Sequence, residues 1–269
     1  IQHKYVETSS HIYGLFQHIC VEYEVVLADS TVIICNKTKF PELFYNIPWS
    51  HGTLGFLVSA MIKIVPCKPY VKLEYIPCSS RTEVISILEV ESRKGKVGRK
   101  VAGVKDFVEA LAFSPSKYVV MIGDMVEEKE VDFSKLNKIG NFWKPWFFMH
   151  VAKYLNFAAK GGSYLEYIPL RHYYHRHTRS LFWEVSEIIP FGNDKWFRYS
   201  LGWMMPPKPS LLKLTQTETL RELYEKHHVV QDMLVPFKDL EESLRKFDKE
   251  FNIYPLWLCP MRVIQSQDI

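Results

Sequence analysis

The order of apolar and polar positions near the start of the chain predicts a β-hairpin. Residues 21–27 alternate between apolar side chains and glutamates, a period of two that is typical of a strand with one buried face. A tight turn at Asp29 then leads into the apolar run 31–35. A helix that begins with Pro41 and an apolar strand over 56–65 follow. This part of the chain therefore mixes helix and strand.

The pattern changes near residues 68–71, where we predict a domain boundary between 1–69 and 70–269. The elements predicted after it are a strand over 70–76, a helix from 80, a loop over 94–105, strands over 107–113 and 118–123, helices over 217–228 and 237–251, and a strand over 253–258. The first of these helices opens with a capping box, Ser80-Arg81-Thr82-Glu83. The fold class expected from this mixture is α+β.

The composition limits the classes of protein that fit. The 269 residues can form one large domain or two modest ones, and 47% apolar with 24% charged residues is typical of a globular protein. The net charge is only +4, and acidic and basic residues interleave, so we expect no nucleic-acid partner. No apolar run reaches the ~18 residues that span a bilayer, and no signal peptide is visible.

Five cysteines are an odd number and include no C-x-x-C pair. We therefore expect reduced thiols in a cytosolic compartment, with neither a disulfide framework nor a zinc site. The chain begins with Ile1 and ends at Ile269 next to predicted elements. We expect it to be an internal part of a longer protein.

The block 164–183 has the most unusual composition. It holds three histidines, three arginines and six aromatic residues. Rings beside cations suit a pocket for a flat or anionic ligand. The alternative is a partly buried helix whose arginines pair with carboxylates elsewhere. A metal site at His172, His175 and His177 is disfavoured because Arg176 and Arg179 would repel a dication.

Two glycine-bearing segments allow two interpretations each. The run Gly52-Thr53-Leu54-Gly55 is either a turn or a loop whose backbone N–H groups approach a phosphate or a flavin edge. The run from Ser9 to Gly14 is either a turn or a cofactor wall. The P-loop, G-x-S-x-G, H-E-x-x-H and G-x-G-x-x-G signatures are all missing from the sequence.

Nine segments together resemble one family. They are S-S-H-I-Y-G-L-F-Q-H (9–18), Y-E-V-V-L-A-D (23–29), L-F-Y-x-I-P-W-S-x-G-T-L-G-F-L-V (43–58), K-P-W-F-F-x-H-V (144–151), E-Y-I-P-L-R-H-Y-Y-H-R-H-T-R-S (166–180), I-I-P-F-G-N (188–193), S-L-L-K-L-T-Q (210–216), H-H-V-V-Q-D-M-L-V-P (227–236) and P-L-W-L-C-P (255–260). These segments resemble the Δ24-sterol reductases, flavoproteins of the vanillyl-alcohol-oxidase type. The resemblance runs from about residue 8 to residue 260.

The resemblance implies a fold in two parts. Residues 1–69 would form the second half of a vanillyl-alcohol-oxidase-type FAD-binding domain. Residues 70–269 would form an incomplete cap domain with an antiparallel sheet and helices. A membrane-anchoring N-terminus and the glycine-rich pyrophosphate loop of the family would precede Ser9. The implied location is the cytosolic face of the endoplasmic reticulum membrane.

The resemblance also implies a reaction. In this family a noncovalent FAD takes a hydride from NADPH and passes it to the side-chain double bond of desmosterol-like sterols. A proton donor then completes the saturation. The flavin supplies the redox chemistry, while the protein orients the substrate, excludes water and delivers the proton.

Candidate residues follow from these expectations. Those assigned to the cofactor wall are Ser9, Ser10, His11, Tyr13, Gly14, Gly52, Thr53 and Gly55. Those assigned to proton donation are His172, Tyr173, Tyr174 and His175, because a tyrosine or a histidinium can deliver a proton without burying a permanent charge. Arg171 and Arg176 are assigned to cofactor phosphate. Structural packing or ion pairing is the alternative for each of them.

Two other functions compete with the reductase. The first is a non-catalytic sterol- or partner-binding module that lacks the flavin pyrophosphate loop. The second is single-stranded RNA binding through the block 164–183. The nearly even charge balance disfavours RNA binding.

Overall fold

The computed structural model describes residues 7–93, 103–160, 162–205, 222, 226 and 232–262. They fall into two compact units. The first comprises the described residues of Ile1–Cys67, Ser92–Asp106 and Cys259–Ile269, and the second those of Lys68–Glu91 and Phe107–Leu258. Most of the helix predicted over 217–228, apart from residues 222 and 226, and most of the loop predicted over 94–105 lie outside the described residues.

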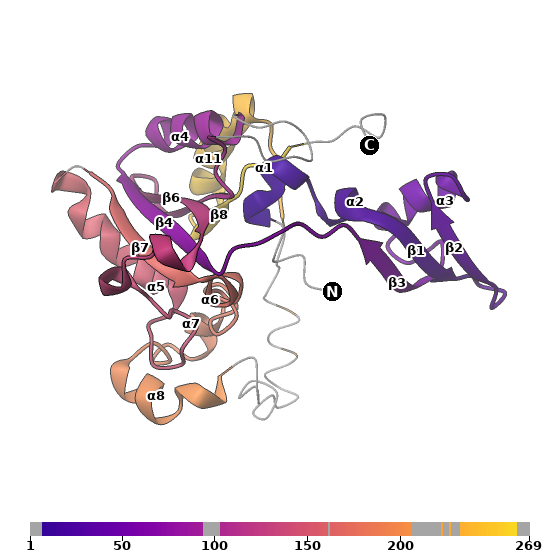
Figure 1. Ribbon diagram of the computed structural model, residues 1–269. Helices are drawn as coiled ribbons and strands as arrows, with labels where there is room; N and C mark the ends of the chain where they lie inside the picture. The colour runs from indigo at the N-terminus through magenta and orange to yellow at the C-terminus, as the bar shows by residue number, and fades with distance from the viewer. Residues whose placement is uncertain are drawn as a thin grey trace. The chain divides into compact units, whose positions relative to one another are not determined.

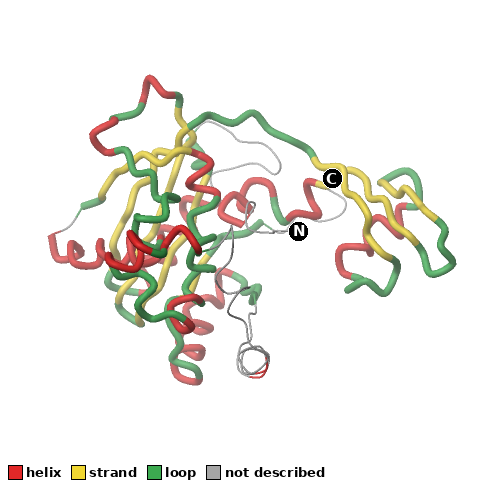
Figure 2. The backbone as a smooth tube through the Cα atoms, turned by 90° about the horizontal axis from the view of Figure 1, so that it is seen from below, coloured by secondary structure: helices red, strands yellow, loops and turns green. Residues whose placement is uncertain are grey.

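The first unit is built around a three-stranded antiparallel sheet in the order β2-β1-β3. Its elements are η2 (Glu7–Ser9), α1 (Ser10–Tyr13), α2 (Phe16–Ile19), β1 (Cys20–Val26), β2 (Val32–Asn36), α3 (Pro41–Asn46), η3 (Ile47–Trp49) and β3 (Phe56–Ile62). Glu24 in the middle strand lies opposite Ile34 on one side and Ser59 on the other. Figure 2 shows the three strands running side by side. The predicted hairpin and the helix at Pro41 are confirmed.

One face of this small sheet is covered and the other is open. Tyr23, Val25 and Cys35 are buried on the covered face, where they pack against Phe44 of α3 and Ile47. The rings of Tyr23 and Phe44 lie 5.1 Å apart. The apolar positions of the predicted alternation therefore supply this core.

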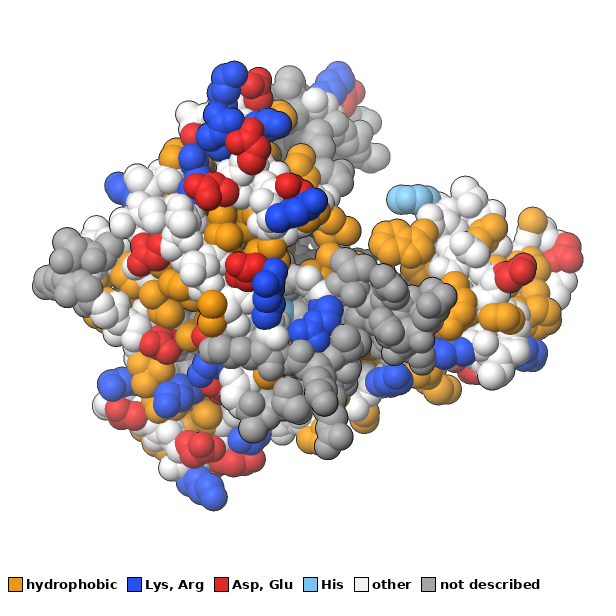
Figure 3. Space-filling view, turned by 90° about the horizontal axis from the view of Figure 1, so that it is seen from above, with side chains coloured by type: hydrophobic (Ala, Val, Ile, Leu, Met, Phe, Trp, Pro, Cys, Tyr) orange, Lys and Arg blue, Asp and Glu red, His pale blue; other side chains and the backbone are white. Residues whose placement is uncertain are grey.

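The strand β3 carries apolar side chains that stay at the surface. Phe56, Val58 and Met61 are all more than half exposed, and Ile64 beyond the end of the strand is 88% exposed. Figure 3 shows hydrophobic side chains gathered over the surface of this unit. The apolar run predicted to be one strand over 56–65 is paired only as far as Ile62.

Gly55 enters β3 with a backbone that other residues rarely adopt, at φ +152°. A Cβ there would lie 2.5 Å from Val25 Cγ1 and 2.9 Å from the Val26 carbonyl oxygen. We therefore expect Gly55→Ala to lower the free energy of unfolding by about 2–4 kcal/mol. Gly52→Ala is the matched control: its φ is +82° and a Cβ would meet nothing within 4 Å, so we expect a loss of about 1–2 kcal/mol. Urea denaturation of both variants tests the order, and an equal loss would contradict it.

The second unit is built around a five-stranded antiparallel sheet in the order β7-β4-β6-β5-β8. Its strands are β4 (Tyr70–Cys78), β5 (Phe107–Ser114), β6 (Lys117–Val126), β7 (Tyr164–Pro169) and β8 (Leu256–Leu258). Its helices are α4 (Arg81–Arg93), η4 (Glu128–Glu130), η5 (Phe133–Lys135), α5 (Phe147–Ala152), η6 (Lys153–Lys160), α6 (Leu170–Tyr174), α7 (Val185–Ile188), α8 (Lys195–Ser200), η7 (Gly202–Met204), η8 (Phe237–Asp239) and α11 (Leu240–Glu250).

Helices cover both faces of the five-stranded sheet (Figure 1). On one face α4 buries Val84 and Leu88 against Val108 and Val120. The helix α11 lies beside α4, where Arg81 and Asp248 form an ion pair of 3.1 Å. Since both faces are covered, the central strands β5 and β6 are buried along most of their length.

The opposite face carries the larger core and is covered by α5, η6, α6, α7 and α8. Tyr75, Met121 and Glu109 lie directly opposite one another on β4, β6 and β5, so their side chains share this face. Leu111 and Trp257 form the next pair on the same side. A glutamate therefore sits inside an otherwise apolar layer.

The predicted antiparallel α+β fold is confirmed, whereas its assignment to an FAD-binding half and a cap stays a prediction. The capping box is confirmed in part: Glu83 N–H donates to Ser80 Oγ at 3.2 Å, and the Glu83 carboxylate accepts from Ser79 N–H at 3.0 Å. The strand predicted over 253–258 is shorter, at Leu256–Leu258. Within the described ranges, no helix has the length and apolar character needed to cross a bilayer.

Candidate functional site

The first group of predicted cofactor residues lies on and beside α1, and its members Ser9, Ser10 and His11 are buried. Ser9 Oγ donates to the carbonyl of Asp106 at 2.8 Å, and Ser10 Oγ donates to the carbonyl of Pro260 at 3.0 Å. His11 Nε2 lies 2.9 Å from the carbonyl oxygen of Lys105. These polar atoms hold α1 against two distant stretches of the same unit.

Tyr13 and Gly14 end this helix. Burial, and to a lesser degree the nearby Asp106 carboxylate, raises the pKa of the half-buried Tyr13. Gly14 has φ +74°, and its N–H donates to the Ser10 carbonyl at 2.9 Å. The glycine therefore supplies a positive-φ backbone, with ψ −158°, that ends the helix.

The second group forms an exposed turn before β3. Thr53 N–H donates to the Ser50 carbonyl at 2.9 Å, and Thr53 Oγ1 donates to the same oxygen at 2.7 Å. Gly52 N–H donates to Ser50 Oγ at 3.3 Å. The turn explains the glycines locally, and its exposed face at Gly52 still allows close approach of a flat ligand.

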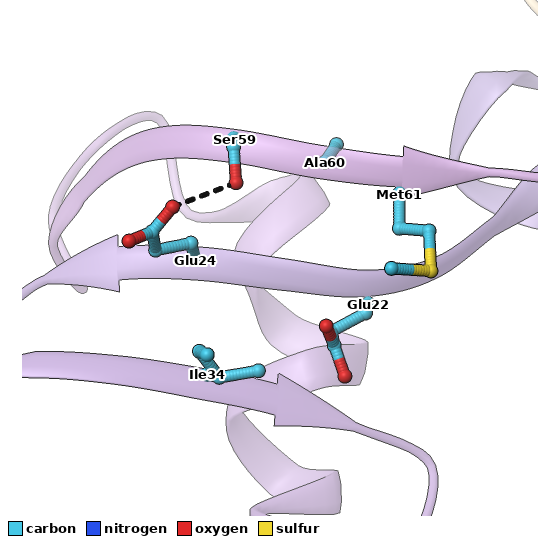
Figure 4. Close-up of a pocket in the computed structure, with 6 residues that line it drawn as sticks. All are labelled: Glu22, Glu24, Ile34, Ser59, Ala60 and Met61. Atoms are coloured by element: carbon cyan, nitrogen blue, oxygen red, sulfur yellow. Dashed lines mark hydrogen bonds between the residues drawn. The ribbon is translucent and has the colours of Figure 1, made fainter.

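A shallow hollow of about 360 Å³ lies on the open face of the three-stranded sheet. Figure 4 shows its lining residues, with Ser59 Oγ donating to Glu24 Oε2 at 2.8 Å. Glu22 and Glu24 place two carboxylates in the hollow. These charges would repel a phosphate, so the hollow does not suit the anionic part of a dinucleotide.

The burial of His11 predicts a pH effect on the first unit. Desolvation is the largest influence on its pKa and lowers it below the usual 6.5. Above about pH 6.5 the imidazole is neutral in both states, whereas below that value the unfolded chain gains a proton that the folded one resists. We expect wild-type stability to fall from about pH 7 to about pH 5.5, and His11→Gln to remove part of that fall. Thermal midpoints at both pH values test this, and parallel pH profiles would contradict it.

The block 164–183 is not one long helix. It begins as strand β7, continues as the short helix α6 and then runs through turns to α7. Its side chains separate by exposure: Tyr173 and Arg176 are buried, His172 and Tyr174 are half-buried, and Arg171 and His175 are exposed. Of these six side chains, Arg171 and His175 are the most accessible to solvent, although His175 is still partly desolvated.

The Glu109 cluster consists of Glu109, Tyr173, Arg176 and Trp257. Arg176 Nη2 donates to both oxygens of Glu109, at 2.9 and 2.8 Å. Tyr173 Oη donates to Glu109 Oε1 at 3.1 Å, and Trp257 Nε1 donates to Oε2 at 2.6 Å. The Glu109 side chain is fully buried, and the four hydrogen bonds that it accepts compensate the loss of its hydration.

Arg176 is held further by aromatic contacts. Its guanidinium carbon lies 4.0 Å from the centre of the Tyr173 ring and 5.4 Å from that of Phe147. Arg176 Nη1 also donates to the Tyr173 carbonyl at 2.8 Å. The alternative expected from the sequence, an arginine paired with a distant carboxylate, describes Arg176 in this structure.

The half-buried and exposed members of the block have different surroundings. His172 Nδ1 accepts from the Gly140 N–H at 3.1 Å. Burial is the largest cause of the lowered pKa of both His172 and His175, and the nearby Arg171 lowers both further. Neutral imidazole is therefore the favoured form of both side chains at neutral pH.

The Glu166 cluster lies on the same sheet face, toward β7. Glu166 accepts from Asn137 Nδ2 at 3.0 Å, from His150 Nε2 at 3.0 Å and from the Tyr75 hydroxyl. Burial alone would raise the pKa of Glu166, but the bonds from His150, Tyr75 and Asn137 outweigh it and leave the pKa lowered. The Tyr75 ring stacks on Tyr154 at 4.3 Å.

Neither Glu109 nor Glu166 was among the candidate residues predicted from the sequence. Glu109 and Glu166 are single acids in apolar strands, F-V-E-A-L-A and Y-L-E-Y-I-P. An isolated acid on the core face of a strand requires a buried partner, and that is the signal that could have revealed them. The structure brings Tyr173 and Arg176 together with Glu109, and leaves His175 and Arg171 at the surface. In the part of the chain that the structure describes, no group of three or more His, Cys, Asp or Glu side chains could hold a metal ion.

Known proteins match nearly the whole chain. A protein of Macaca fascicularis named Delta(24)-sterol reductase is 54% identical over 262 residues, which is 97% of this chain and 48% of that protein. Over nearly its whole length, the chain is similar to about half of a Δ24-sterol reductase. The Δ24-sterol reductase of Homo sapiens is also 54% identical over 262 residues, with the same coverage of both chains. That of Arabidopsis thaliana is 43% identical over 264 residues, 97% of this chain and 46% of the plant protein.

The chain spans about half the length of the Δ24-sterol reductases it matches. No protein-family model matches it. The resemblance drawn from the nine sequence segments is thereby confirmed, and the matching proteins include both primate and plant relatives. The site residues expected from that resemblance stay predictions.

Proposed function

We propose that this chain is part of a reductase that saturates the side-chain Δ24 double bond of sterols in sterol biosynthesis. The observation that carries the proposal is 54% identity over 97% of the chain to proteins named for this activity. The block 164–183 supports it, because it presents imidazole, phenol and guanidinium groups from one short segment. The proposed location is the cytosolic face of the endoplasmic reticulum membrane, with attachment through an N-terminal segment.

The proposed cofactors are a noncovalent FAD and NADPH, and the chain fits them in part. FAD, when bound, supplies hydride transfer. The exposed turn at Gly52 and Thr53 offers backbone to a flat ring system without an intruding side chain. The side-chain donors of Ser9 and Ser10 already bind backbone carbonyls, so their contribution would be to hold α1 in position.

The arginines divide between two tasks in this proposal. Arg171 is exposed and can approach a cofactor phosphate from solvent. Arg176 already binds both oxygens of Glu109, and this carboxylate compensates the charge of the guanidinium within the core of the second unit. We therefore assign phosphate contact to Arg171 and a positioning role to Arg176.

The proton required for saturation is best held by a phenol. The lowered pKa values of His172 and His175 leave little imidazolium at neutral pH, whereas a phenol keeps its proton there. Tyr174 is half-buried, while the hydroxyl of the buried Tyr173 donates a hydrogen bond to Glu109. Tyr174 is accordingly the donor that a substrate could reach with the least rearrangement.

A segment exchange tests the proposal. The 262 matching residues of human Δ24-sterol reductase are replaced by this chain, and the purified chimera is assayed with NADPH and desmosterol. We expect bound flavin that NADPH bleaches, recovery of its colour on addition of sterol, and a product with a saturated side chain. A folded chimera that binds flavin and sterol but does not reduce the sterol would support the non-catalytic binding module instead.

A further inference from the structure

The second unit carries an exposed group of aromatic side chains at one end. The aromatic face consists of Trp143, Phe191, Trp196, Tyr199, Leu201 and Trp203. Trp196, Tyr199 and Trp203 are 59%, 66% and 53% exposed. They come from α8, near the bottom of Figure 1, and from the turn of helix that follows it. Monomeric proteins seldom leave a concentration of large rings of this kind in water without a partner.

The sequence of α8 explains why these rings point outward. Phe197 and Arg198 are the buried residues of this six-residue helix, so Trp196 and Tyr199 on either side of them face solvent. Arg198 is turned inward, where Nε donates to the Asn193 carbonyl at 2.7 Å and Nη1 donates to the Trp143 carbonyl. The Arg198 side chain therefore holds α8 in place through these hydrogen bonds and does not add charge to the exposed surface of the helix.

The rings are held in place before any partner binds. Phe191 and Trp196 stack at 5.8 Å between ring centres. Trp203 Nε1 donates to the Ser200 carbonyl at 3.0 Å, so the polar edge of this indole is satisfied internally. A ring whose donor is already bonded can enter an apolar layer without the cost of an unmade hydrogen bond.

The charges around the aromatic face favour a neutral partner. Asp194 and Lys195 are exposed next to each other and have opposite signs, while Arg198 is buried. Such an arrangement has no single-sign field for nucleic acid, an anionic membrane or a charged protein. Tryptophan and tyrosine side chains on a surface of little net charge are typical of protein regions that lie among the headgroups of a bilayer.

We propose that the aromatic face is a membrane-contact surface that inserts its rings at the headgroup level of a zwitterionic phosphatidylcholine bilayer. This contact is distinct from an N-terminal anchor, because it lies on the folded second unit. It does not depend on the proposed reductase activity. Since insertion of rings carries it, the binding should change little with salt concentration.

The test uses the 269-residue chain and phosphatidylcholine vesicles. We expect the wild type to sediment with the vesicles at both low and high salt, and its tryptophan fluorescence to be quenched by brominated phosphatidylcholine. The variant Trp196→Gln/Tyr199→Gln should bind at least ~10-fold more weakly, because two of the most exposed rings are lost. Phe133→Gln is the matched control, since Phe133 is 55% exposed on the same unit outside the aromatic face, and it should bind like the wild type.

Three outcomes would overturn the proposal. The first is a wild type that stays in solution without quenching. The second is an equal loss of binding in the Phe133 control. The third is a lipid-free dimer, seen by sedimentation velocity, that the double substitution abolishes while vesicle binding is unchanged, since that result assigns the face to a second copy of the chain. The quenching measurement needs no substitution and remains decisive if the double variant does not fold.

Discussion

Replacing Glu109 with alanine should lower the free energy of unfolding by about 3–5 kcal/mol, among the largest effects we expect for a single substitution in this chain. The reason is the fully buried partner: without the carboxylate, the Arg176 guanidinium stays enclosed among Tyr173, Phe147 and the sheet with no counter-charge. Tyr173 and Trp257 also lose their acceptor. Urea denaturation followed by circular dichroism measures the loss.

Two further variants separate the buried charge from other causes. Glu109→Leu combined with Arg176→Met should recover part of the stability, because no guanidinium is then left without a carboxylate. Glu242→Ala removes the acid of an exposed ion pair with Arg245 and should change little. A loss for Glu109→Ala no greater than that for Glu242→Ala would refute the assignment of a buried ion pair.

Replacing Glu166 with alanine should cost at least about 3 kcal/mol, since about 1–3 kcal/mol is lost for each buried donor left without an acceptor. Three donors depend on this carboxylate: the Tyr75 hydroxyl, the Asn137 amide and His150 Nε2. Melting of the second unit, followed by near-ultraviolet circular dichroism of its tyrosines and tryptophans, measures the loss. A variant that melts like the wild type would show that water replaces the carboxylate.

The lowered pKa of Glu166 sets the direction of its pH dependence. The stability it contributes is complete above the usual glutamate value of 4.5 and is lost as the pH falls below that value toward the folded-state pKa. The stability gap between wild type and Glu166→Gln should therefore narrow between about pH 6 and about pH 3.5. Asn137→Ala is the control, because it removes a neutral donor of the same cluster and leaves the titrating group in place.

Local patterns predicted the parts of the fold that local physics decides. The alternation over 21–27 produces β1 because its period places Tyr23 and Val25 on one face of a strand. The capping box at Ser80 marks the start of α4 because it depends on residues only a few positions apart. Features of this kind depend on residues that are close in sequence, so a local pattern is enough to predict them.

The candidate site was predicted less completely because its bonds are long-range. The block 164–183 stands out in the sequence by its composition, but its separation into β7, α6 and turns follows from sheet pairing with β4. Arg176 finds Glu109 across 67 positions of sequence, and Trp257 reaches the same carboxylate across 148. Nothing within a few residues of Arg176 specifies either partner. A cation beside rings therefore predicted a ligand pocket as readily as a buried ion pair.

The hydrogen bonds between α1 and residues far along the sequence determine when the first unit can form. Ser10 and its acceptor Pro260 are 250 positions apart, and Ser9 and Asp106 are 97 apart. At about 5–20 residues per second, a ribosome needs roughly 12–50 s to make the intervening 250 residues. Lys105 and Asp106 become available to α1 early in that interval, whereas Pro260 follows only after all five strands of the second unit, ending with β8, have been synthesised. The bond from Ser10 to Pro260 is therefore the last of these contacts that synthesis allows, so the first unit cannot be completed before the second unit has been synthesised.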